Sequence, residues 1–80
     1  MISPTELREL REDLGYRWGL GRPLQYKELG LVLGFTGRDV GQTPWRWERG
    51  QSTPQPVAIT LMRLMRDGYK PAHVDAVLGL

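Results

Sequence analysis

The stretch TPWRWERG, residues 43–50, holds two tryptophans two positions apart, with an arginine between them and Glu-Arg-Gly at its end. On a strand, Trp45 and Trp47 would share one face. On a helix their side chains would point about 200° apart, so that one ring faces the protein and the other faces outward. The elements around this stretch therefore decide which chemistry its side chains offer.

Charge is unevenly distributed along the chain, although the net charge is only +2. Residues 1–13 hold four acidic side chains and two arginines, whereas residues 14–50 hold six basic and three acidic side chains. Positive charge thus collects in the middle of the chain, where a polyanion would be met. A solvated charged face is the alternative, and charge alone does not separate the two.

Catalytic and metal-binding patterns are missing from the sequence. His73 is the only histidine, and nothing pairs it with a nucleophile. There is no cysteine and no phosphate loop of the GxxxxGK type. We therefore expect a protein that is not an enzyme and has no metal, cofactor or small-molecule ligand, with His73 as a partly exposed helix residue or a dimer contact.

The 80 residues allow one domain, spanning 1–80. A chain this short buries only about 60% of the surface that its unfolded form exposes, so a second subunit is the remaining way to enlarge the core. The N-terminal residues lack the features of a signal peptide, and no apolar stretch approaches the ~18 residues of a membrane span. We expect a cytoplasmic protein with no membrane partner.

Helix start and stop signals predict an all-α fold of four to five short helices. Ser3-Pro4-Thr5-Glu6 is a capping box with proline at the first helical position, and leucines recur at helical spacing up to Gly15, a left-handed stop. Glycines, prolines and apolar stripes mark the later elements. The expected helices span residues 4–14, 25–33, 43–49 and 56–67, the third of them starting at Thr43 or Pro44, with a helical turn near 37–41 and a short fifth helix after Pro71.

Residues 16–23 contain glycines, a proline, arginines and aromatics without any period, which predicts an ordered loop. We expect Tyr16, Trp18 and Leu20 to lean on the domain. Gly30, inside the second helix, indicates the close approach of another helix, because a glycine there otherwise only weakens the helix.

Residues 24–50 resemble the helix-turn-helix of the Cro/phage-repressor, or XRE-like, family. Its second helix typically reads leucine, serine or threonine, glutamine, any residue, glutamate, leucine, alanine, two variable residues, leucine, glycine; residues 24–34 here read LQYKELGLVLG. Its third helix ends in Trp-Glu-Arg-Gly or close to it, as residues 47–50 do. Both connecting loops are longer than in a minimal member, Tyr26 replaces the glutamine, and Pro44 replaces an aliphatic residue. The resemblance runs from residue 4 to about residue 67 and implies a core at 1–50, with the helix-turn-helix at about 25–49.

The resemblance implies structural roles for a few residues. Trp47 is the core tryptophan, packed between the first and fourth helices, and Gly30 lets the third helix pack on the second. Glu48 pairs with Arg11 and fixes the third helix against the first. Trp45 lies on the opposite face, where it either contacts phosphate or sugar or covers the fourth helix or the long loop.

The resemblance also implies double-stranded DNA as partner, with the exposed face of the third helix in the major groove and the start of the second helix at the phosphates. The residues expected to contact bases are Arg38, Gln42, Thr43 and Arg46. Those expected at phosphates are Gln25, Tyr26, Lys27, Trp45 and Arg49, with Arg17 and Arg22 in the long loop as weaker candidates.

The C-terminal helices, residues 56–80, predict a homodimer, because the fourth helix has more apolar surface than a domain of this size can cover. The residues expected at the dimer interface are Met62, Met65, Val74, Val77 and Leu78. The alternative is that the fifth helix folds back over its own domain and covers the two methionines in a monomer.

These features together predict a sequence-specific DNA-binding transcriptional regulator, a bacterial or phage repressor that binds an inverted repeat as a homodimer at the nucleoid. A helical protein-interaction module of the same fold, such as an antitoxin or an inhibitor of a nuclease system, is the alternative. A DNA-binding module in phage packaging or recombination is a third possibility.

Overall fold

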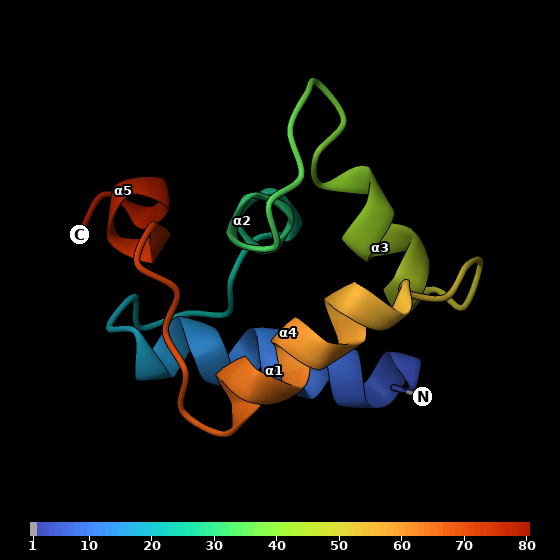
Figure 1. The fold of residues 1–80 in the computed structure, drawn as a ribbon, viewed down its shortest axis with the longest axis horizontal. Coiled ribbons are helices and arrows are strands. Elements are labelled where there is room, and N and C mark those ends of the chain that lie inside the picture. Colours follow the sequence, from blue (N-terminus) through green and yellow to red (C-terminus); the bar gives the residue numbers. More distant parts are fainter. Residues whose placement is uncertain (1) are drawn as a thin grey trace.

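The structure, a computed structural model, describes residues 2–80, which form five α-helices and no strand. The expected all-α fold of four to five short helices is confirmed. The helices are Pro4–Arg17 (α1), Tyr26–Val32 (α2), Gln42–Glu48 (α3), Pro56–Arg66 (α4) and Val74–Leu78 (α5). In Figure 1, α4 lies in front of α1, and α2 and α3 lie above this pair with α5 beside α2. None of the helices within residues 2–80 is long and apolar enough to cross a bilayer.

Helix α1 begins as predicted and ends later than predicted. The Ser3 hydroxyl accepts a hydrogen bond from the Glu6 amide at 3.1 Å, and the Ser3 amide donates to the Glu6 carboxylate at 3.2 Å. Gly15 does not stop the helix, because α1 continues to Arg17. A Cβ added to Gly15 would lie 1.9 Å from the carbonyl oxygen of Arg22, so glycine is needed here for the close passage of the following loop.

That loop is ordered, as expected, but its aromatic residues differ in role. The Trp18 side chain is buried in the core, and Leu20 packs against the core from a half-buried position. Tyr16 belongs to α1 and is 60% exposed, so the expectation that it leans on the domain is wrong.

The connection between α2 and α3 is a turn without a helix of its own. Within it, the Gln42 amide donates to the carbonyl of Asp39 at 2.9 Å. The helical turn expected near 37–41 is therefore absent. A Cβ on Gly30 would lie 2.2 Å from the Val40 carbonyl oxygen, which shows that Gly30 accommodates this turn and not another helix.

One core joins all five helices and includes Leu7, Leu14, Leu29, Trp47, Met62, Met65 and Val74. Met62, Met65 and Val74 have no exposed surface within a single chain, so their expected place at a dimer interface is wrong. Val77 and Leu78 are half-buried against the same core.

Helix α5 folds back over its own domain, which was the alternative to dimerisation through this segment. Its main contact is α2, and the His73 Nε2 atom, at the start of α5, lies 2.8 Å from the Val32 carbonyl oxygen. His73 thus ties α5 to the end of α2 while its side chain stays largely exposed. Helix α5 packs within its own chain because α2 supplies the apolar surface that α5 needs.

Candidate nucleic-acid interface

Helix α3 has one anchored side and one exposed side. Pro44 and Trp47 are buried, and Pro44 lies in the first turn, where its missing amide proton leaves no helix bond unmade. Gln42, Thr43 and Arg46, three of the residues expected at bases, are exposed. Since positions four apart on a helix share a face, Gln42 and Arg46 present their polar groups side by side.

Arg38, the fourth residue expected at bases, does not lie on α3. It is an exposed residue of the turn that precedes the helix. This turn projects beyond α2 and α3 at the top of Figure 1. The structure therefore separates Arg38 from the row of polar side chains on α3.

Trp45 and Arg49 form a pair on α3. The Arg49 guanidinium carbon lies 4.9 Å from the centre of the Trp45 ring, in a cation–π arrangement. Trp45 is half-buried and Arg49 is exposed, whereas Trp47 is only 4% exposed. The opposite directions predicted for the two tryptophans are confirmed, and Trp45 holds a cation at the edge of the exposed face.

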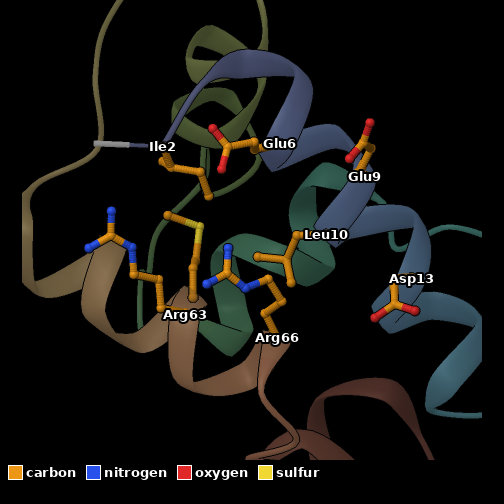
Figure 2. A pocket seen from close by; sticks show the side chains of 8 residues that line it. Ile2, Glu6, Glu9, Leu10, Asp13, Arg63 and Arg66 are labelled. Atoms are coloured by element: carbon orange, nitrogen blue, oxygen red, sulfur yellow. The ribbon is translucent and has the colours of Figure 1, made fainter.

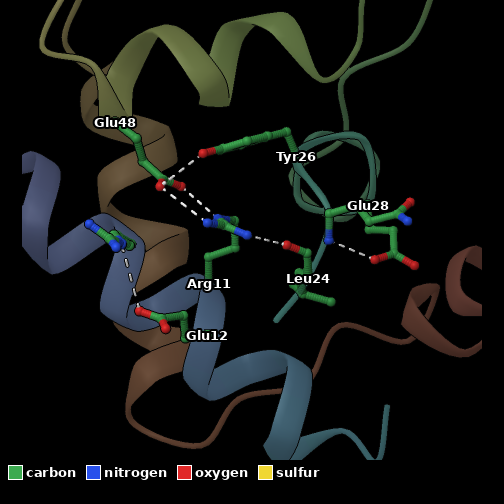
Figure 3. Close-up of polar contacts among 8 residues, drawn as sticks. Arg11, Glu12, Leu24, Tyr26, Glu28 and Glu48 are labelled. Atoms are coloured by element: carbon green, nitrogen blue, oxygen red, sulfur yellow. Dashed lines mark hydrogen bonds and ion pairs between the residues drawn. The ribbon is translucent and has the colours of Figure 1, made fainter. Parts of the chain in front are cut away.

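Arg11 and Glu48 form the expected ion pair between α1 and α3 (Figure 3). Arg11 Nε donates to Glu48 Oε2 at 2.7 Å and Arg11 Nη2 to Glu48 Oε1 at 3.3 Å, while Nη1 donates to the Leu24 carbonyl at 2.6 Å. Only 14% of the Arg11 side chain and 6% of the Glu48 side chain are exposed. This paired and nearly buried charge fixes the orientation of α3 relative to α1 and the loop before α2.

Tyr26 belongs to the same cluster, in place of the phosphate contact expected for it. Its hydroxyl donates to Glu48 Oε1 at 3.3 Å, and its ring lies 4.4 Å from the Arg11 guanidinium carbon. The ring is half-buried and its hydroxyl has a partner within the protein. No sequence signal pointed to this role, because it depends on how α2 meets α3.

The two weaker phosphate candidates are also engaged within the protein. Arg17 donates to the carbonyl groups of Met65 at 2.6 Å and Arg66 at 3.1 Å and pairs with Asp13, so it closes the last turn of α4. Arg22 donates to both carboxylate oxygens of Glu28, at 2.8 and 3.0 Å. Both side chains serve the scaffold.

Gln25 and Lys27 remain exposed at the start of α2, as a phosphate role requires. A Cβ on Gly41 would lie 2.8 Å from the Lys27 amide nitrogen, so the beginning of α3 lies directly against the beginning of α2. Gln25 and Lys27 are thereby brought next to the first turn of α3.

Glu28 supports this end electrostatically. Its carboxylate accepts from the Gln25 amide at 2.7 Å, and the hydrogen bond from Arg22 holds the pKa of Glu28 below its ordinary value of 4.5. The spacing of three residues between Gln25 and Glu28 is that of a capping box, a signal that could have revealed this contact in the sequence.

We expect Glu28→Gln to lower the free energy of unfolding by about 0.5 to 1 kcal/mol at pH 7. A folded-state pKa below the unfolded value means that the carboxylate stabilises the fold above pH 4.5 and that this stabilisation is lost as the pH falls through the lowered pKa. Urea unfolding at pH 7 and pH 3 measures the effect, and the difference between the two proteins should be smaller at pH 3. Glu12→Gln is the control, and a gap that persists unchanged at pH 3 would contradict the prediction.

Within residues 2–80, no three histidine, cysteine or carboxylate side chains gather in a way that could hold a metal ion. Comparison of the chain with protein families, with curated proteins and with solved structures finds no match.

Proposed function

We propose that this protein is a sequence-specific DNA-binding transcriptional regulator that inserts α3 into the major groove. The observation that carries the proposal is the row of exposed Gln42, Thr43 and Arg46 on a short helix whose other side is held by Trp47. Arginine and glutamine side chains read the paired donors and acceptors on base edges. The resemblance of residues 24–50 to the Cro/phage-repressor family supports the same use of these residues.

Backbone contacts in this proposal come from the flanks of α3. Gln25 and Lys27 lie at the adjoining start of α2, and the stacked Trp45 and Arg49 lie at the edge of the exposed face. Arg38, on the projecting turn, would in this proposal meet DNA outside the stretch that α3 reads. Contacts to phosphate fix the register of the protein on DNA, and base contacts supply the specificity.

A homodimer bound to an inverted repeat completes the proposal, with a repressor acting at the bacterial nucleoid as its biological setting. The two copies of α3 would then lie about 34 Å apart, one turn of DNA. Since three of the residues expected at the interface are buried, the contact would involve Val77, Leu78 or the exposed Val57 and Leu64 of α4.

Selection of bound sequences from random DNA, followed by titration, tests the proposal. A palindromic consensus is expected. Arg46→Ala should weaken binding to the selected site by about 1 to 3 kcal/mol more than binding to random DNA, whereas Lys27→Ala should weaken both alike and reduce the salt slope by about one. Arg8→Ala on α1 is the control. An Arg46→Ala protein that keeps its full preference for the selected site would contradict the proposal.

A second candidate is a protein-interaction module such as an antitoxin or a nuclease inhibitor. It is favoured by the exposed apolar side chains on α4, where Val57 is 80% and Leu64 50% exposed. Salt separates the two functions, because DNA binding through several phosphates weakens steeply with salt and a mostly apolar protein interface does not.

A further inference from the structure

A cleft of about 250 Å³ opens between α1 and α4, and no residue of α2 or α3 lines it. Glu6, Glu9 and Asp13 of α1 line one side of it, and Arg63 and Arg66 of α4 line the other (Figure 2). A ligand in the cleft would thus have acidic side chains on one side and basic side chains on the other.

The charged side chains of the two walls form no ion pair with each other among residues 2–80. Arg66 is nevertheless near enough to help the hydrogen bonds with Ser3 to lower the pKa of Glu6. Asp13 pairs with Arg17 on α1. The Arg66 Nε atom lies 3.8 Å from the Asp67 Oδ1 atom, next to it in the chain. Glu9 and Arg63 have no ion-pair partner in this part of the chain. Opposite charges therefore face each other across a gap that they do not close.

The two helices that form the walls are held together at one end of the cleft by the side chain of Arg17. Arg17 donates from α1 to the carbonyl groups of Met65 and Arg66 and so fixes the end of α4 against α1. Walls with a fixed separation favour a ligand that matches the separation, because less conformational freedom is lost on binding.

The floor of the cleft is apolar and shallow. It is formed by Ile2, Leu10 and Met62, whose side chains are at most 7% exposed. The volume lies below the range of about 300 to 1,000 Å³ that is usual for drug-sized ligands. A molecule that fits is therefore small, with one short apolar group and two unlike charges.

We propose that this cleft binds a free amino acid with an aliphatic side chain. The ammonium group would lie at Glu6 and Glu9, the carboxylate at Arg63 and Arg66, and the side chain on the apolar floor. Each charge then forms a charge-assisted hydrogen bond with the wall of opposite sign. The proposal is independent of DNA binding.

Isothermal titration of the full chain with L-leucine, without DNA, tests this site. Saturable binding of one molecule per chain is expected at concentrations up to about 10 mM. N-acetyl-L-leucine lacks the ammonium and L-leucinamide lacks the carboxylate, and each should bind about tenfold more weakly. No saturable binding of L-leucine, or derivatives that bind as tightly as L-leucine itself, would overturn the proposal.

Charge-neutral variants locate the site. Glu9→Gln and Arg63→Gln should each weaken L-leucine binding about tenfold. Glu12→Gln and Arg8→Gln, on α1 but outside the cleft, are the matched controls and should leave it unchanged. All four side chains are exposed, and circular dichroism melting verifies that each variant folds. Equal affinities in all four variants would place the ligand elsewhere and refute the assignment.

Discussion

Replacing Trp47 with alanine is expected to lower the free energy of unfolding by about 3 to 5 kcal/mol. The Trp47 ring is only 4% exposed and belongs to the core that joins α1 and α4. Phe35 packs edge-on against it, with 5.8 Å between ring centres. Alanine would leave a cavity that these neighbours fill only in part. Urea unfolding followed by circular dichroism measures the loss.

Trp45→Ala is the matched control, two positions away on the same helix. The Trp45 ring is half-buried, and its specific contact is the guanidinium of Arg49. Loss of an exposed cation–π contact costs about 0.5 to 1 kcal/mol. Equal losses of stability in the two variants would show that the two rings are not divided between core and surface.

Arg11→Ala is expected to lower the free energy of unfolding by about 3 kcal/mol, because it leaves the nearly buried Glu48 carboxylate without its ionic partner. It also removes the donor to the Leu24 carbonyl. A double-mutant cycle with Glu48→Ala isolates the interaction between the two side chains. We expect a coupling energy of at least about 1 kcal/mol, since the pair has hydrogen bonds of 2.7 and 3.3 Å.

The exposed pair Arg8 and Glu12 on α1 provides the comparison. Their charged atoms are 4.0 Å apart, and their side chains are 69% and 48% exposed. Solvent screening should hold the coupling of this pair to about 0.3 to 0.5 kcal/mol. If the coupling energy between Arg11 and Glu48 is no larger than that between Arg8 and Glu12, the ion pair does not fix the orientation of α3.

Local signals in the sequence predicted the local parts of the fold well. The capping box at Ser3 and the prolines and glycines around α4 placed helix ends close to where the structure has them. These signals act within one or two turns of helix, so no distant contact is needed to interpret them. The Arg11–Glu48 pair is different, because it is distant in sequence and was predicted through the family resemblance.

Contacts made by distant segments were harder to predict. In the sequence, Gly15 indicates the end of a helix. Its role in the structure is to leave room for the Arg22 carbonyl, and this depends on the path of the following loop. Likewise, the apolar stripe containing Met62 and Met65 shows which face of α4 is buried, but not that the same chain buries it. The partners of Tyr26 and Arg17 were missed for the same reason, since Glu48 and the end of α4 come near them only in the folded chain.

The bonds from Arg17 to the last turn of α4 also bear on the order in which the chain folds during synthesis. Arg17 and Met65 are 48 residues apart, and a ribosome adds about 5 to 20 residues per second. Helix α1 therefore waits about 2 to 10 seconds after its own synthesis before the carbonyl groups that hold it exist. During that interval its leucines have no α4 to pack against.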